Sequence, residues 1–278
     1  MMRRPLFLAF LLLPCLALPA QSYEVGAYGG FSYYDGDLAP NRLGLYFQTL
    51  RPAFGVFVRA NVVRWVSLRA GYTQLRIMGD DAISGRDRRG LNFRTDLREL
   101  SLTLEVNLFR LPLFREGIVA EGYLLGGAGR YQFNPVAEYG GQRYELQPYG
   151  TEGQGLRGYL DKYERTQWNL LGGGGVKLHL SERWILGLEG SGRVNFTDFL
   201  DDVSDQRVAY QDVLDGNGAT AARLFRPTFD PERDDPTRRI NRGGPARDYV
   251  LTGGVTVSYL FGPSTQGQGW GAPKCPEF

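Results

Sequence analysis

The sequence contains very little lysine, histidine or cysteine. Only three residues are lysine: Lys162, Lys177 and Lys274. His179 is the one histidine, and the two cysteines are Cys15 and Cys275. If residues 1–20 are removed, as argued next, Cys275 is left without an internal partner. A fold stapled by disulfides within one chain is therefore excluded.

Long apolar runs are scarce too. The run Leu6 to Leu18 follows Arg3 and Arg4 and leads into Ala20. A basic start, a short apolar stretch and a final small residue form the layout of a secretory signal peptide. The run is shorter than the roughly 20 residues that a membrane-spanning helix needs. We therefore expect residues 1–20 to be a signal peptide that is cleaved after Ala20.

The expected mature chain has no excess of charge of either sign. Residues 1–20 contain two of the 32 basic residues and none of the 30 acidic ones, so the remaining charges balance. A nucleic-acid partner would require a basic footprint, and none is expected. Lipid attachment at Cys15 is not expected either, because Pro14 stands where a lipoprotein signal has a small residue.

Alternation of apolar and polar residues is abundant. Over Glu99 to Leu108 every second residue is leucine or valine, which is typical of a strand with one apolar and one polar face. Seven further segments alternate or are rich in glycine and aromatic residues. The eight predicted strands span Tyr23–Tyr34, Ala53–Val63, Val66–Ile77, Glu99–Leu108, Val119–Phe133, Trp168–Leu180, Trp184–Phe196 and Tyr249–Phe261. An even count is expected of a bacterial single-chain barrel.

The connections between these segments predict the topology. Short joins at 63–65, 110–117 and 181–183 alternate strictly with long ones at 35–51, 78–93, 134–166 and 199–247. In an up-and-down barrel, this places every long loop at the extracellular rim and every short turn at the periplasmic rim. We expect an all-β, eight-stranded antiparallel barrel over residues 21–262 and a periplasmic tail over 263–278. Residues 227–247, rich in proline and charge, are expected to be a solvated loop tip.

A soluble barrel with an apolar interior would also alternate, so the direction of the polar face decides the class. That face has few lysines and opposed charges at mid-strand, which can neutralise each other in a lumen just wide enough for side chains. Trp168 and Trp184 end strands on the apolar face, where membrane barrels have aromatic girdles. We therefore predict an outer-membrane barrel with a filled lumen, not an open pore. The predicted lumen charge network is Arg59, Arg69, Glu99, Glu105, Lys177, Glu189 and Arg193.

The sequence offers little for catalysis. A barrel enzyme that acts on lipid needs a nucleophile and a base facing the lipid. His179 is on the polar face beside Lys177, with no obvious Ser or Asp companion. The run Gly172–Gly175 lacks the Gly-Lys-Ser/Thr of a phosphate loop, so close packing or curvature in mid-strand is the better interpretation. We expect no enzyme activity and no cofactor.

Acidic residues gather where strands meet the long loops. Asp198, Asp201 and Asp202 are weak candidates for a calcium site, because calcium prefers oxygen ligands. The segment does not fit a known calcium-binding loop, and Asp is also common in turns. We expect no metal.

Short segments at the strand ends, taken in order along the chain, resemble the PorG family. This family comprises outer-membrane barrel proteins of the Bacteroidota type IX secretion system. The last five residues, Lys274 to Phe278, are also similar. The matching segments are Tyr33–Leu38, Gly79–Ala82, Phe133–Pro135, Ala137–Tyr139, Leu146–Pro148, Gly150–Gly155 and Phe196–Ser204.

The resemblance implies a non-enzymatic component of a secretion machine. PorG-like proteins accompany the periplasmic ring of PorK and PorN, and they are needed to secrete cargo with a C-terminal sorting domain. The expected partners are therefore these ring proteins and other type IX components, besides outer-membrane lipid. The expected contact surface is the periplasmic turns and the tail, with Cys275 and Phe278. Two alternatives stay open: a free-standing structural small barrel, and a lipid-modifying barrel enzyme.

The last predicted strand ends on Tyr259-Leu260-Phe261. This ending resembles the terminal signal that barrel-insertion machinery reads, so that machinery is an expected partner during biogenesis. The tail that follows Phe261 is a departure from barrels that end on this residue.

Overall fold

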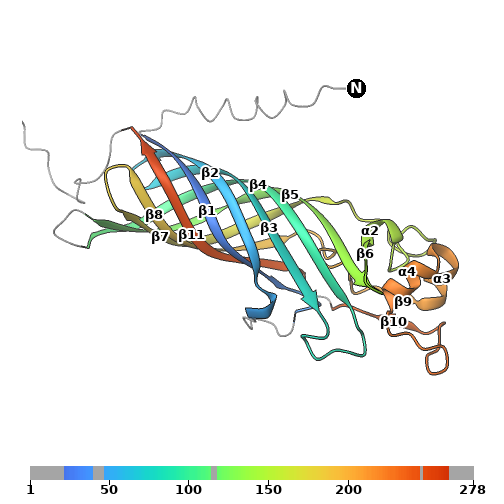
Figure 1. Cartoon of the computed structure of the whole chain (residues 1–278). Coiled ribbons are helices and arrows are strands. Elements are labelled where there is room, and N and C mark those ends of the chain that lie inside the picture. Colours follow the sequence, from blue (N-terminus) through green and yellow to red (C-terminus); the bar gives the residue numbers. More distant parts are fainter. Residues whose placement is uncertain (1–21, 40–46, 114–117, 245–246, 263–278) are drawn as a thin grey trace, which may run out of the picture.

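The computed structural model describes residues 22–39, 47–113, 118–244 and 247–262. Its centre is a closed barrel of antiparallel strands (Figure 1). The eight barrel strands are β1 (Ser22–Asp35), β2 (Arg51–Val63), β3 (Val66–Asp80), β4 (Asn92–Pro112), β5 (Val119–Tyr139), β7 (Thr166–His179), β8 (Trp184–Asn195) and β11 (Tyr249–Phe261). Pairing of β1 with β11 and of β4 with β5 closes the cylinder. The predicted signal peptide and the tail from residue 263 lie outside the described residues.

All eight predicted segments are strands, but β4 and β5 extend further toward the extracellular side than expected. Backbone pairing between them continues to Arg94 opposite Val136. The outward side chains here are Arg94, Asp96 and Arg98, so apolar alternation stops while hydrogen bonding of the backbone goes on. Apolar residues alternate only where the strand contacts lipid, so the alternation ends before the strand does.

The polar face points into the lumen and the apolar face points outward. On β4, Leu100, Leu102 and Leu104 are each about half exposed, whereas Glu99 before them and Glu105 after them are buried. A soluble protein would bury such leucines, because burial of apolar surface drives folding in water. A continuous apolar exterior around a polar interior is the arrangement of a membrane barrel. The protein is therefore an outer-membrane β-barrel, and the soluble alternative is wrong.

Aromatic side chains mark both ends of the apolar exterior. Trp168 lies near the start of β7 and Trp184 begins β8, at opposite ends of this hairpin, and each side chain is more than half exposed. Trp184 packs edge-on against Tyr259 on the neighbouring strand, with ring centroids 5.2 Å apart. Tryptophan and tyrosine prefer the interface between lipid and water, so these positions fit the girdles of an inserted barrel.

Short and long connections lie at opposite rims. The turns at 64–65 and 180–183 lie at one end, as do the end of β4 and the start of β5, and the elements of the long loops gather at the other end, at the right of Figure 1. A short 3-10 helix, η2 (Phe47–Thr49), precedes β2. By the general orientation of such barrels, the long-loop rim is extracellular.

The third and fourth long loops fold into a compact extracellular cap, which we define as residues 140–165 together with the described part of 196–248. Its elements are β6 (Gln142–Glu145), α2 (Leu146–Tyr149), β9 (Arg207–Ala209), α3 (Tyr210–Asn217), α4 (Ala219–Phe225) and β10 (Arg239–Asn241). Val208, Val213 and Phe225 form part of its own apolar core. Within the described residues, no helix is long and apolar enough to cross a membrane.

The expectation of a solvated loop tip over 227–247 is wrong in part. Strand β10 pairs with β9, and the Arg242 side chain is buried. Arg242 donates hydrogen bonds to Glu152 and to the backbone oxygen of Asp202, which ties this segment to the rest of the cap. Contacts over this sequence distance leave no periodic pattern, so composition alone suggested a solvated segment.

The glycine run in β7 allows neighbouring backbones to approach closely. A Cβ added at Gly173, which faces the lumen, would lie 2.3 Å from the carbonyl oxygen of Gly190 and 2.7 Å from Cα of Ser191. A Cβ at the adjacent Gly172, on the outer face, meets nothing within 4 Å. Strand glycines of this kind permit close approach and strong curvature.

We expect Gly173→Val to destabilise the barrel by about 1–3 kcal/mol or more, because rigid backbone must move to admit the side chain. Gly172→Val is the matched control and should be near neutral. The measurement is the folded, heat-modifiable fraction on gels after refolding into detergent at increasing urea. Equal urea midpoints for the two variants would contradict the close approach.

Candidate functional site

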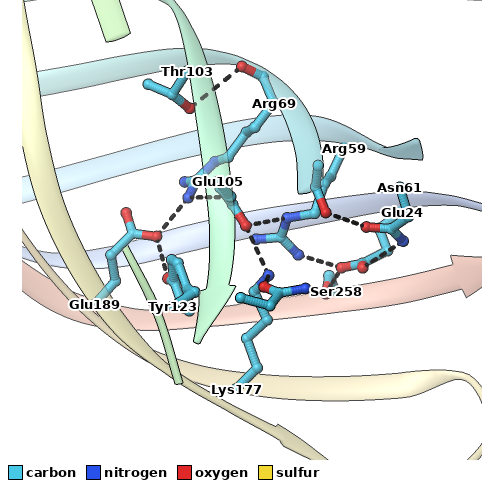
Figure 2. Close-up of polar contacts among 12 residues, drawn as sticks. Glu24, Arg59, Asn61, Arg69, Thr103, Glu105, Tyr123, Lys177, Glu189 and Ser258 are labelled. Carbon is cyan, nitrogen blue, oxygen red and sulfur yellow. Dashed lines mark hydrogen bonds and ion pairs between the residues drawn. The ribbon is translucent and has the colours of Figure 1, made fainter. Parts of the chain in front are cut away.

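The lumen is organised around one buried carboxylate, Glu105 on β4. Arg59 Nε lies 2.9 Å and Lys177 Nζ 2.7 Å from Glu105 Oε2, and Arg69 Nη1 lies 3.5 Å from Oε1. Figure 2 shows the three cations reaching Glu105 from β2, β3 and β7. Glu105 and Arg59 are almost fully inaccessible to solvent. This cluster therefore links four strands through charges that have little contact with water.

Two further carboxylates extend this cluster across the lumen. Glu189 on β8 pairs with Arg69 at 2.5 Å and accepts a hydrogen bond from Tyr123 Oη at 2.6 Å. Glu24 on β1 pairs with Arg59 and accepts a hydrogen bond from Ser258 at 2.9 Å (Figure 2). Asn61 donates a further hydrogen bond to Glu24. Each guanidinium thus lies between two carboxylates.

A second ion pair lies nearer the extracellular side. Arg193 Nε lies 2.9 Å from Glu99 Oε2 and its Nη2 3.0 Å from Oε1, so the pair is bidentate. Asn169 and Thr252 complete the hydrogen bonds of the two charged groups. All seven charged residues predicted to share the lumen are located there, in two groups.

Sequence reasoning missed two acidic lumen residues. Glu24 lies in a glycine-rich strand with weak alternation, and Glu121 lies where the two faces of β5 are hard to tell apart. Glu121 is 3.9 Å from Lys177 and 3.8 Å from His179 Nε2. His179 therefore has an acidic neighbour in the lumen that the sequence did not reveal.

The lumen is closed at mid-height. The cavity between Arg69, Glu189 and Arg193 has a volume of about 30 Å³. That is room for roughly one water molecule. An ion or solute would have to break several buried ion pairs to pass, so the charged side chains form a plug.

An apolar layer closes the extracellular mouth above the charges. Phe133, Tyr163 and Phe199 stack in sequence, with centroid distances of 5.8 Å and 4.7 Å. Leu200, from the loop after β8, is fully buried, and its carbonyl oxygen accepts a hydrogen bond from Thr95 Oγ1 at 2.7 Å. The loop thus inserts into the extracellular mouth of the barrel and occludes it.

A buried polar cluster fastens this loop to the barrel. Tyr34 Oη lies 2.7 Å from carboxyl oxygens of both Asp201 and Asp248. A phenol has one proton, so it can donate to only one of them and accept from the other if that carboxyl is protonated. Burial, together with repulsion from neighbouring carboxylates, raises the pKa of both Asp201 and Asp248 well above the ordinary value. The two carboxyls therefore share a proton with the hydroxyl between them.

The carboxylate of Asp202 also accepts hydrogen bonds from protein side chains. Thr151 and Tyr163 donate hydrogen bonds to Asp202, and burial raises the pKa of Asp202 to about 7. Glu152 pairs with Arg242 at 3.0 Å and accepts from Ser204 Oγ at 2.5 Å. These contacts join the cap to the loop that carries Asp202.

The three weak calcium candidates, Asp198, Asp201 and Asp202, are not gathered around one point in the described structure. Asp201 and Asp202 turn to hydroxyl and backbone donors, and burial raises the pKa of the third candidate, Asp198, to about 7. Nowhere in the described chain do three His, Cys, Asp or Glu side chains gather in a way that could hold a metal ion. Cys275 and Phe278, the predicted contact residues of the tail, lie outside the described residues.

The family profile described as "Domain of unknown function (DUF6089)" matches residues 3–147, which is more than half of the chain. The chain belongs to the DUF6089 family. This match covers the strands that carry Glu24, Arg59 and Glu105 and ends within α2. A search of curated proteins finds no match to this DUF6089 member.

Several solved structures of small barrels are similar to this DUF6089 protein at low identity. Neisserial surface protein A is 9% identical with a TM-score of 0.41, covering 86% of this chain and 97% of that one. The N-terminal barrel of Pseudomonas aeruginosa OprF is 10% identical with a TM-score of 0.36, covering 87% of this chain and 98% of that one. Ail of *Yersinia pestis* is 12% identical with a TM-score of 0.37, covering 87% and 99%. The barrel assignment rests on the strand pairing above.

We expect Glu105→Gln to lower the free energy of unfolding by about 3–5 kcal/mol, because it leaves three lumen cations, two of them buried, without their shared carboxylate. The matched control is Asp96→Asn, which removes one partner of the exposed Arg76–Asp96 pair and should cost at most about 1 kcal/mol. Urea unfolding in lipid vesicles measures both. Equal losses in the two variants would contradict the central role of Glu105.

We expect the attachment of the cap to weaken as pH rises from about 4, the ordinary carboxyl pKa. Asp201, Asp202 and Asp248 have raised pKa values in the folded state, so the unfolded state binds fewer protons in this range and stability falls with pH. For Asp202 the loss is complete above its pKa of about 7. Hydrogen exchange of residues 196–206, corrected for intrinsic rates, measures the effect.

Asp201→Asn is the matched variant for this pH dependence. Its amide can donate to Tyr34 Oη and still accept from the Val203 backbone, which mimics the protonated acid. The pH dependence of exchange should flatten while protection persists. Protection that rises with pH in the unmodified protein would contradict the shared proton.

Proposed function

We propose that this protein is a non-enzymatic outer-membrane anchor of a type IX secretion assembly, a mount and not a channel. The observation that supports an anchoring role is the plug of charged side chains around Glu105, which leaves the barrel no open passage. The assignment to type IX secretion is supported by the ordered resemblance to the PorG family. Neither support depends on a catalytic group.

A pore is disfavoured by the cost of opening the lumen. The ion pairs of Glu105, Glu189 and Glu99 connect five of the barrel strands, β2, β3, β4, β7 and β8. Separating one buried pair costs about 3–5 kcal/mol. Substrate passage through the barrel would require several such losses together with withdrawal of the Leu200 loop.

A lipid-modifying enzyme is disfavoured by the position of the only histidine. His179 is buried in the lumen near the periplasmic end of β7, beside Lys177 and Glu121. An enzyme acting on membrane lipid would place its base on the outer wall or at the rim, within reach of the acyl chains or headgroup. The geometry therefore favours a structural role for His179.

The segments that resemble the PorG family meet in one place. Tyr34 contacts Asp201, Thr151 contacts Asp202, and Glu152 contacts Ser204, although these pairs are far apart in sequence. Phe133 stacks on Tyr163 in the same region. The resemblance thus concerns residues that build one buried unit, the junction of cap and barrel, which supports a shared fold more strongly than scattered matches would.

The periplasmic surface is the proposed contact with the ring proteins PorK and PorN. The described part of this rim offers only short turns, with Arg64, Trp65 and Arg183 among their residues. Short turns leave little area for a stable interface, because specific interfaces bury about 800 Å² per partner. The tail from residue 263, with Cys275, would supply the rest.

The prediction concerns what Cys275 captures. A bifunctional cross-linker attached there in intact cells should trap ring proteins. The matched control moves the only thiol of the mature chain to the extracellular cap by combining Cys275→Ser with Arg233→Cys, and this control should trap none. Deletion of the protein should also stop secretion of cargo.

Other outcomes identify the alternatives. Purification from native membranes without ring proteins, together with unchanged secretion on deletion, would contradict the anchor and indicate a free-standing structural barrel. Altered lipid A in the deletion strain would indicate a lipid-modifying enzyme.

A further inference from the structure

The outer wall of the barrel carries a cluster of arginines directly above its apolar belt. Outward positions on β4 change abruptly toward the extracellular end, in the order Leu104, Leu102, Leu100, Arg98, Asp96 and Arg94. The neighbouring strands change at the same level, since Tyr72 is followed by Gln74 on β3 and Ala128 by Arg130 on β5. The arginines therefore begin where the hydrocarbon layer ends.

An aromatic side chain marks this level. Leu100 is opposite Arg130, and Arg130 is opposite Trp168 in the next pairing. The guanidinium of Arg130 lies 5.8 Å from the centre of the Trp168 ring. Tryptophan prefers the headgroup level of a membrane, so this row lies among lipid headgroups.

The arginines line a groove. It has a volume of about 820 Å³ and runs over the outer face of β3, β4 and β5, strands that lie side by side in Figure 1. Arg94, Arg98, Arg143 and Arg165 are among its lining residues, together with the carboxylates of Asp80, Asp96 and Glu138. A groove of this size can hold a sugar-phosphate headgroup, since ligand pockets commonly measure about 300–1,000 Å³.

The groove keeps an excess of positive charge, because Arg94, Arg98 and Arg143 share it with only two further lining carboxylates, Asp80 and Glu138, beyond the pairs that follow. Asp96 is neutralised by Arg76 at 2.5 Å, and Glu145 by Arg165 at 3.2 Å. Within the described part of the chain, neither Arg94 nor Arg98 has an acidic partner. Arg51 lies close enough to Arg76 and Arg94 for mutual repulsion. An anion in the groove would relieve this repulsion.

We propose that this groove binds the phosphoryl headgroup of an outer-leaflet glycolipid of the lipid A class. The planar guanidinium fork matches the oxygens of a phosphate better than other side chains do. The acyl chains of such a lipid would lie along Leu100, Leu102 and Leu104, directly below the groove. This binding is independent of any role in secretion, and it would fix the height and tilt of the barrel in the bilayer.

The test uses the full chain in detergent and native mass spectrometry with added lipid A. Arg94→Gln combined with Arg98→Gln should weaken lipid A retention about tenfold or more, since tenfold corresponds to about 1.4 kcal/mol and two charge-assisted hydrogen bonds contribute at least that much. Arg233→Gln combined with Arg238→Gln removes the same charge from the exposed cap and should leave retention unchanged. The heat-modifiable band should persist in both double variants, because all four side chains are exposed or only partly buried.

Two further arms separate the sources of affinity. Dephosphorylated lipid A should be retained about as weakly as lipid A is by the Arg94 and Arg98 double variant. Inorganic phosphate at equal concentration should not displace lipid A. Equal retention of lipid A by both double variants, equal retention of the dephosphorylated lipid, or displacement by free phosphate would each overturn the proposal.

Discussion

An eight-stranded barrel encloses an interior just wide enough for side chains, so the charges that fill it must neutralise one another. In this protein Glu105 is the shared partner of three cations, because Arg59, Arg69 and Lys177 reach it from three other strands, and Glu24 and Glu189 supply the remaining negative charge. The arrangement also fixes register. A shift of one residue along β4 would turn Glu105 to the lipid and Leu104 to the lumen. The same strand register therefore satisfies the lumen charges and keeps the exterior apolar.

At the junction of cap and barrel, buried acidic groups are likewise satisfied from several segments, here by hydrogen bonds. Asp201 and Asp248 are buried with Tyr34 between them, and they remain there because a proton is shared within the cluster. The loop that they hold closes the mouth with Leu200 and stacks Phe199 on Tyr163. The barrel is thus occluded at mid-height and again at its mouth. Its interior supports the fold, and recognition is left to the rims and the outer wall.

Much of the fold could be predicted from the sequence, because contact with lipid on one side imposes alternation. The seven charges assigned to the lumen followed from the same parity, since a charged residue between leucines has only one face to occupy. The alternation could not assign a face to Glu24, because glycines interrupt the pattern in β1. It could not assign one to Glu121 either, because the two faces of β5 have similar residues there. It also ended at Arg98, above the lipid, although β4 continues to Asn92.

The cap was beyond sequence reasoning for a different reason. Its decisive contacts, such as Thr151 with Asp202 and Arg242 with Glu152, join separate loops and leave no repeat. Acidic residues at the rim therefore suggested calcium, whereas hydroxyl and guanidinium groups from distant segments satisfy them. Membership of the DUF6089 family identifies relatives and leaves the activity open.

Electrical recording from the purified full chain in planar lipid bilayers tests the occluded lumen most directly. The structure predicts no stable conductance steps in the unmodified protein, because the ion pairs around Glu105 fill the lumen and the Leu200 loop closes its mouth. Regular, long-lived steps from the folded, heat-modifiable protein would contradict the plug and, with it, the role of the barrel as a mount.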